Sequence, residues 1–363
     1  MTAEHEPAHP VVLASGALVA GIVGAAAGAG VGLRHLQKVG LSPNTVVGLA
    51  LLVVGLVLLG YAGGVAWNRL RRRWRLVLVP AGLVVLMVVS SIALGVMASV
   101  VPPTVLGSGT PADHGLHYRD VELETSDGVR ISGWYVPSEN RAALVLRHGA
   151  GSTRTATLDQ AAVLGRHGYG LLLVDARGHG ESGGRGMDLG WYGDRDVAAA
   201  LDFLAARPDV DADRLGLFGL SMGGEEAIGA AAAPGVQVRA VVAEGATART
   251  AVDKDQWLPG GIQGTVQRGL DRLTFGVADL LTQTSPPTAL HEAVASTAET
   301  DFLLVTAGEE PDEALAAEGF AGAAPSRVKV LEVAGASHTH GLDAAPGQWR
   351  REVLAFLDAR LQP

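Results

Sequence analysis

The chain has 363 residues, of which 48% are hydrophobic and 18% charged, and its formal net charge is −9. This negative charge provides no basic surface for phosphates, so nucleic-acid binding is not expected. The absence of cysteine excludes disulfides and thiolate metal sites. A chain of this length forms one or two domains. Its apolar residues are concentrated before residue 102, which indicates two parts of different character.

Three long apolar runs occupy the first part, at residues 11–33, 46–67 and 76–101, and none contains a charged residue. Each reaches the roughly 20 residues needed to cross a bilayer. A cleaved signal peptide would explain only one of them. Buried core helices would be shorter and would have a polar face. The pattern therefore predicts a membrane region over residues 1–101 with three transmembrane helices.

Small residues recur at every fourth position in the first run, which is mostly alanine and glycine. This composition leaves open whether the first run crosses the membrane. The glycines of the stripe are Gly16, Gly24, Gly28 and Gly32. Such a stripe allows close packing against another helix, so we expect helix–helix association, including self-association of the chain. Accidental spacing in a Gly/Ala-rich segment is the alternative. Ser91, Gly95 and Ser99 repeat the pattern in the third run.

The short connection between the second and third runs is strongly basic, with arginine at positions 69, 71, 72, 73 and 75. Such clusters stay on the cytoplasmic side of the membrane. The third helix would then run outward, and everything after residue 102 would lie outside the cytoplasm. We therefore predict a multi-pass protein of the cell membrane, with the lipid bilayer as a partner and an extracytoplasmic second part.

The second part begins with a polar linker at residues 102–116 and continues as a domain over residues 117–363. Short apolar or alternating runs predict strands at 118–124, 129–136, 142–146, 170–174, 215–220, 238–243, 302–306 and 328–333. Helical patterns lie between them, including 157–167, 191–207 and 348–361. Residues 246–287 break this alternation and are interpreted as a short cap over the site. Strands that alternate with helices predict an α/β fold, a mostly parallel sheet with helices on both faces.

One serine stands between glycines at the junction of a strand and a helix, in Gly219-Leu220-Ser221-Met222-Gly223. This is the sequence form of a nucleophile elbow, a strained turn that exposes the hydroxyl above the sheet. Glycine two residues before and after the serine lets strand and helix approach closely. A second match surrounds Ser182, but the Gly-Gly-Arg-Gly that follows does not start a helix. We interpret Ser221 as the nucleophile and Ser182 as a loop residue.

Four further segments accompany the elbow motif in a characteristic order. The set is DGVRISGWYVP, LVLRHGAG, VDARGHGES, GLSMGG and GASHTHG. In these motifs, residues 116–363 resemble the α/β-hydrolases, and more narrowly the membrane-anchored serine hydrolases that include the Bem46-like proteins and relatives of the prolyl-peptidase-type hydrolases. The resemblance implies the α/β-hydrolase fold and serine-hydrolase chemistry. It leaves the substrate open, because this fold carries many reactions.

The resemblance implies that His338, in the loop after the last strand, is the general base, since the family order is serine, acid, histidine. His340 is then either a supporting group or a solvated loop residue. A zinc site at these two histidines has no third ligand cluster nearby, and neither a metal nor an organic cofactor is expected. We assign structural roles to His148 and His179, although His179 near Asp175 could imitate a catalytic pair.

The anion formed when the serine attacks must be met by two N–H donors that are already in place. In this family, one donor is the backbone N–H of the residue after the nucleophile, here Met222. The other comes from the turn after His148-Gly149, which favours Ala150. Both act through the backbone, so their side chains carry little information.

The acid departs from the family pattern, which places an aspartate three residues after a glycine that ends the seventh strand. That glycine is Gly308, and the expected position holds Pro311. Asp312, one residue later, is therefore our predicted acid. The alternatives are Glu309, Glu310 and Glu244.

These features predict a membrane-anchored serine hydrolase that cleaves an ester of moderate size through an acyl-enzyme. A serine peptidase or a thioesterase on the same triad is the close alternative. A non-catalytic binding module anchored to the membrane is the alternative of another class, but it has no need of both Ser221 and His338. Transport is disfavoured because the apolar runs contain no charged residue that would form an ion pathway.

Overall fold

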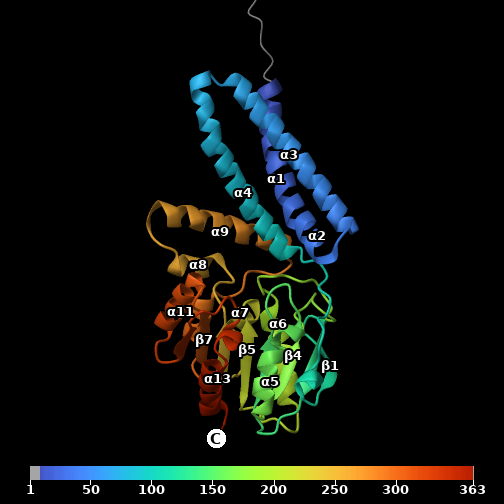
Figure 1. Ribbon diagram of the computed structural model, residues 1–363, viewed down its shortest axis with the longest axis vertical. Helices are drawn as coiled ribbons and strands as arrows, with labels where there is room; N and C mark the ends of the chain where they lie inside the picture. The colour runs from blue at the N-terminus through green and yellow to red at the C-terminus, as the bar shows by residue number, and fades with distance from the viewer. Residues whose placement is uncertain (1–8, 363) are drawn as a thin grey trace, which may run out of the picture. The chain divides into compact units, whose positions relative to one another are not determined.

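The computed structural model describes residues 9–362 (Figure 1). The chain divides into two units. The first comprises residues 1–102 together with 261–282, and the second comprises residues 103–260 and 283–363. The first unit is helical, whereas the second contains the sheet.

Three apolar helical stretches form most of the first unit. The first consists of α1 (His9–Gly28), a π-helical segment (Ala29–Leu33) and α2 (Arg34–Val39), and it is followed by α3 (Pro43–Arg69) and α4 (Leu78–Ser99). Ser42 caps α3, since its side chain accepts a hydrogen bond from the Thr45 N–H. The stretches Pro10–Val39, Pro43–Arg69 and Arg72–Ser99 are long and apolar enough to cross a membrane.

The glycine stripe of the first apolar run faces α3 of the same chain. A Cβ added to Gly28 would lie 2.3 Å from the Leu52 nitrogen, and one added to Gly32 would lie 2.7 Å from backbone atoms of Gly48 and Leu49. These helices therefore approach at backbone distance, as small residues permit. A Cβ on Gly16 would have nothing within 4 Å. Self-association through this stripe stays a prediction, because α3 already covers three of its glycines, Gly24, Gly28 and Gly32.

The segment interpreted as a cap forms two helices, α8 (Ala251–Trp257) and α9 (Gly261–Leu281). Helix α9 belongs to the first unit, where it packs against α4. The sequence pattern placed this segment in the hydrolase domain, so the predicted division of the chain does not hold for α9. Its partner is distant in sequence, and local pattern does not reveal such contacts.

Eight strands form one sheet in the second unit, in the spatial order β1-β2-β4-β3-β5-β6-β7-β8. Strand β2 is antiparallel to both β1 and β4, and all other pairs are parallel. The strands are β1 (Arg119–Glu124), β2 (Arg130–Val136), β3 (Ala143–Arg147), β4 (Gly170–Val174), β5 (Leu215–Leu220), β6 (Ala240–Glu244), β7 (Asp301–Ala307) and β8 (Val328–Val333).

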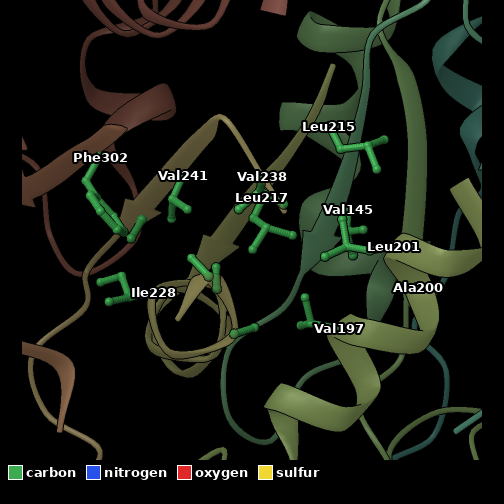
Figure 2. Close-up of a cluster of buried hydrophobic side chains, with 14 of the residues drawn as sticks. Val145, Val197, Ala200, Leu201, Leu215, Leu217, Ile228, Val238, Val241 and Phe302 are labelled. Carbon is green, nitrogen blue, oxygen red and sulfur yellow. The ribbon is translucent and has the colours of Figure 1, made fainter. Parts of the chain in front are cut away.

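Helices cover both faces of this sheet, as the sequence predicts. They are α5 (Leu158–Arg166), α6 (Gly193–Ala205), α7 (Met222–Ala231), α10 (Leu290–Ser296), α11 (Pro311–Ala323), α12 (Gly341–Ala344) and α13 (Pro346–Leu361). Alternate residues of each strand enter different buried clusters, because strand side chains point to opposite faces. Val145 joins the cluster with α6 and α7, whereas Leu144 joins the one with α5 and α13. Figure 2 shows the first cluster, in which strand side chains gather with Val197 and Ile228.

The parallel strands β3, β5 and β6 end at one edge of the sheet, at Arg147, Leu220 and Glu244. Loops beyond the carboxyl ends of parallel strands are where α/β proteins bind ligands. The segments singled out in the sequence, after β3, β5, β7 and β8, therefore converge on this edge.

Candidate active site

Ser221 occupies the sharp turn between β5 and α7, with φ 52° and ψ −120°. A positive φ in a non-glycine residue is strained and needs support from its surroundings. Part of that support is a hydrogen bond of 2.7 Å from the Ser221 N–H to the carbonyl of Glu244. A Cβ on Gly219 would lie 2.1 Å from the Gly223 carbonyl oxygen, and one on Gly223 would lie 2.5 Å from the Arg147 oxygen. The elbow therefore requires both glycines.

A chain of hydrogen bonds links Ser221, His338 and Glu313. His338 Nε2 lies 2.8 Å from Ser221 Oγ, and His338 Nδ1 lies 2.6 Å from Glu313 Oε1. Because a carboxylate only accepts, Nδ1 carries the proton and Nε2 is free to accept from the serine hydroxyl. The other Glu313 oxygen accepts a 2.8 Å hydrogen bond from the Ala307 N–H.

The charges around His338 favour its protonated form. The hydrogen bond to Glu313 raises the pKa of His338, and the charge of that carboxylate adds to the effect, while burial opposes it. Glu313 is only 2% exposed, whereas the His338 side chain is 47% exposed. The imidazole can therefore receive a proton and reach a ligand while its buried partner stays in position.

The prediction that Asp312 is the acid beside His338 is wrong by one position, since the partner is Glu313. Helix α11 begins at Pro311, and consecutive helical residues point about 100° apart. Asp312 consequently faces solvent and Glu313 turns inward. Counting from the strand end does not supply this helical phase. The sequence did contain one indication of where α11 begins, Pro311 itself, because proline favours the first helical position.

Glu244 does not contact His338 but holds the loop that carries it. One carboxylate oxygen accepts from the Gly341 N–H at 2.8 Å and the other from Trp349 Nε1 at 2.9 Å. Burial raises the pKa of Glu244. Because Glu244, at the end of β6, contacts Gly341 and Trp349 and not the imidazole, this alternative assignment of the acid is wrong.

The two remaining alternatives, Glu309 and Glu310, lie in the turn between β7 and α11. The N–H of Glu309 donates to the Ala336 carbonyl, and that of Glu310 donates to the Ala307 carbonyl. The charge of Glu310 contributes to the raised pKa of His338. Both glutamates thus shape the turn, and Glu313 occupies the position at Nδ1.

Ser221 and His338 open into a pocket of about 600 Å³. Gly149 and Ala150, from the turn after β3, also line this pocket. A Cβ on Gly149 would lie 3.3 Å from Ser221 Cβ, so this turn lies directly against the serine. Met222 is the first residue of α7, where backbone N–H groups lack a partner within the helix. Both predicted oxyanion donors are therefore next to Ser221, and their role stays a prediction.

The other singled-out residues have structural partners. Ser182 Oγ donates to the Asp175 carbonyl at 2.9 Å and accepts from the Ser132 N–H at 2.9 Å, as expected of a loop residue. His148 Nε2 accepts from the Ala176 N–H at 2.9 Å, and burial lowers the pKa of this histidine. His179 lies 3.4 Å from Asp188, and Asp175 pairs with Arg154. His340 pairs with Asp343 at the surface.

Part of the chain is similar to known hydrolases. The profile of the serine aminopeptidase family S33 matches residues 138–303. An uncharacterized protein of Mycobacterium tuberculosis is 36% identical over 116 residues, which are 31% of this chain and 41% of the relative. The thiohydrolase aneE of Aspergillus aculeatus is 36% identical over 120 residues, which are 31% of this chain and 37% of the relative. The chain thus spans only about 40% of the length of these curated relatives.

Among solved structures, the Pyrococcus furiosus esterase Pf2001 is similar in fold, with a TM-score of 0.58 and 23% sequence identity. The match covers 72% of this chain and 98% of the esterase. Three observations lead to one conclusion. They are the eight-stranded sheet with one antiparallel strand inside it, the serine at the elbow and the family match. The second unit has the α/β-hydrolase fold.

Proposed function

We propose that this protein is a membrane-anchored serine hydrolase that cleaves an ester through an acyl-enzyme intermediate. The observation that carries the proposal is the continuous hydrogen-bonded chain from Ser221 Oγ through His338 to Glu313. A histidine in this position activates a serine hydroxyl by taking its proton. The strained turn at Ser221 presents that hydroxyl to the pocket.

In the proposed reaction, Ser221 Oγ attacks the acyl carbon while His338 Nε2 takes the hydroxyl proton. The Glu313 carboxylate stabilises the resulting imidazolium through Nδ1. The backbone N–H groups of Met222 and Ala150 donate to the anionic oxygen. His338 then returns the proton to the leaving alcohol. Water, activated by the same nitrogen, releases the acid and restores Ser221.

An ester is the first candidate for the substrate. A pocket of about 600 Å³ suits an acyl group of moderate size. A thioester is the second candidate, because a relative is named a thiohydrolase. A peptide is the third, because the matching family is one of serine aminopeptidases. All three pass through the same acyl-enzyme and differ in the leaving group.

The anchoring proposal rests on the three apolar helical stretches and on the basic connection between α3 and α4. Within that connection, Arg75 donates to the Trp67 carbonyl at 3.0 Å and lies over its ring at 4.7 Å. We propose that this loop stays cytoplasmic and that the second unit lies outside the cytoplasm. Alkaline phosphatase fused after Leu116 should then be active. Activity of a cytoplasmic reporter at that position would reverse the orientation.

Labelling of the full-length protein in detergent with a fluorophosphonate probe tests the chemistry. We expect the wild type and Ser182→Ala to be labelled and Ser221→Ala to be unlabelled. Labelling that persists in Ser221→Ala would refute the nucleophile. An unlabelled wild type that also fails to cleave p-nitrophenyl esters of graded chain length would favour the non-catalytic binding module.

A further inference from the structure

Helix α9 has an exposed apolar stripe. Six apolar residues follow the spacing of one helical face, at steps of three and four. They are Ile262, Val266, Leu270, Leu273, Val277 and Leu280. Ile262 is 86% exposed, Leu280 83% and Val266 44%. Arg268 and Arg272 lie off this stripe, whereas Asp271, Phe275 and Ala278 on the far face of the helix are buried.

The middle of α9 packs tightly against α4. Thr274 Oγ1 donates a 3.0 Å hydrogen bond to the Ser91 carbonyl. A Cβ added to Gly95 would lie 2.5 Å from the Thr274 carbonyl oxygen and 2.8 Å from Val277 Cβ. The second stripe of small residues found in the sequence is therefore the surface that receives α9. Close backbone approach with an interhelical hydrogen bond is typical of helix packing in membranes.

This contact lies close to one end of a predicted transmembrane helix. Helix α4 ends at Ser99, so Gly95 and Ser91 lie about 6 and 12 Å from its end, at 1.5 Å per residue. Figure 1 shows α9 crossing α4 in this region. Amphipathic helices in the plane of a membrane bury their apolar face about 5–10 Å into the boundary between headgroups and acyl chains. With the end of α4 taken as the surface of the membrane, α9 meets α4 at about the depth of that boundary.

The apolar stripe continues along α9 on both sides of Thr274. Ile262 precedes Thr274 by twelve residues, and Leu280 follows it by six. On α4, Leu94 next to Gly95 is 54% exposed, so both helices expose apolar side chains near their contact. An apolar surface that adjoins a membrane-spanning helix at this depth is suited to lipid.

We propose that α9 lies in the interface of the lipid bilayer, with Ile262, Val266 and Leu280 among the acyl chains and Arg268 and Arg272 toward the headgroups. This rests on the proposed membrane anchoring through α4. The chain leaves the catalytic unit at Gly260 and returns at Gln283. The membrane would therefore hold an insertion of the hydrolase itself, in addition to the N-terminal helices.

The chain contains no cysteine, so single cysteines can be introduced without removing native ones. We suggest attaching an environment-sensitive fluorophore to the full-length protein in nanodiscs of mixed zwitterionic and anionic phospholipid. The test positions are Ile262→Cys and Leu280→Cys. Asp279→Cys is the matched control, because it is exposed and adjacent to Leu280 but points about 100° away. Leu83→Cys on α4 reports the span, and Leu315→Cys on α11 reports an exposed apolar site of the catalytic unit.

We expect Ile262 and Leu280 to be quenched by nitroxide-labelled lipid and to be quenched by aqueous iodide several-fold less than Asp279 and Leu315. Leu83 should be quenched by lipid alone. If Leu83 meets lipid but Ile262 and Leu280 are open to iodide, the position of α9 is refuted while the anchoring stands. Shielding of the two sites from both quenchers would mean that protein covers α9, which also overturns the proposal. A water-exposed Leu83 would refute the anchoring and, with it, this inference.

Discussion

The substitution Glu313→Gln tests the assignment of the acid, because the structure determines how glutamine must orient. One Glu313 oxygen accepts from the Ala307 N–H at 2.8 Å and the other accepts from His338 Nδ1 at 2.6 Å. Glutamine has one acceptor oxygen and one amino group. The fixed backbone N–H of Ala307 requires the oxygen on its side, so the amino group faces His338. Nδ1 must then accept a hydrogen bond, and the ring proton moves to Nε2.

That tautomer cannot take a proton from Ser221, because Nε2 already carries one. In serine proteases, the corresponding carboxylate-to-amide change lowers kcat by about 10⁴. At about 1.36 kcal/mol per tenfold change, this loss corresponds to about 5 kcal/mol of transition-state stabilisation. We expect a decrease of this order in kcat for p-nitrophenyl ester hydrolysis by full-length Glu313→Gln, with KM changed much less. The fluorophosphonate labelling rate should fall in parallel.

Asp312→Asn is the matched control, since Asp312 is adjacent in sequence and exposed. Exposed substitutions away from special features change free energies by about 0.5 kcal/mol, so its kcat should stay within about threefold of the wild type. Glu313→Ala should retain more activity than Glu313→Gln, because alanine leaves His338 free to adopt either tautomer. Near-normal activity in Glu313→Gln together with collapse in Asp312→Asn would refute the assignment and the tautomer argument.

Three further predictions follow from the site. His338 must be deprotonated to act as a base, and Glu313 raises the pKa of His338. Glu313→Ala should therefore shift the acid limb of the pH profile of kcat/KM to lower pH. An unchanged acid limb would mean that another group titrates there. Glu244→Gln places an amino group against one of the two N–H donors that Glu244 accepts from, the Gly341 N–H and Trp349 Nε1. Because a buried polar group left unsatisfied costs about 1–3 kcal/mol, hydrogen exchange around Gly341 in the full chain should accelerate. Unchanged protection there would contradict the role of Glu244 in holding the histidine loop. Gly219→Ala should abolish fluorophosphonate labelling, because its Cβ would lie 2.1 Å from the Gly223 oxygen. Gly319→Ala on α11, where a Cβ meets nothing within 4 Å, should label normally and be more stable by about 1 kcal/mol; equal labelling of both variants would refute the steric argument.

Much of the fold follows from local sequence pattern. A strand is specified by a short apolar or alternating run, and the eight predicted runs correspond to β1–β8 with shifts of at most two residues at their ends. The elbow could be predicted for the same reason, since its strand, its two glycines and its helix lie within a few residues of Ser221. The apolar runs likewise correspond to helices long enough to span a membrane.

Contacts between residues far apart in sequence were decided only by the tertiary structure. The partner of His338 depends on the phase of α11, and one residue along a helix turns a side chain by about 100°, which separates exposed Asp312 from buried Glu313. The packing of α9 on α4 joins Thr274 to Ser91, 183 residues apart. The small residues Ser91, Gly95 and Ser99 indicated that the third apolar helix had a surface for close packing, but nothing in the sequence identified α9 as its partner. Which surfaces meet depends on how the chain returns through space, and residue spacing along one helix carries no information about that path.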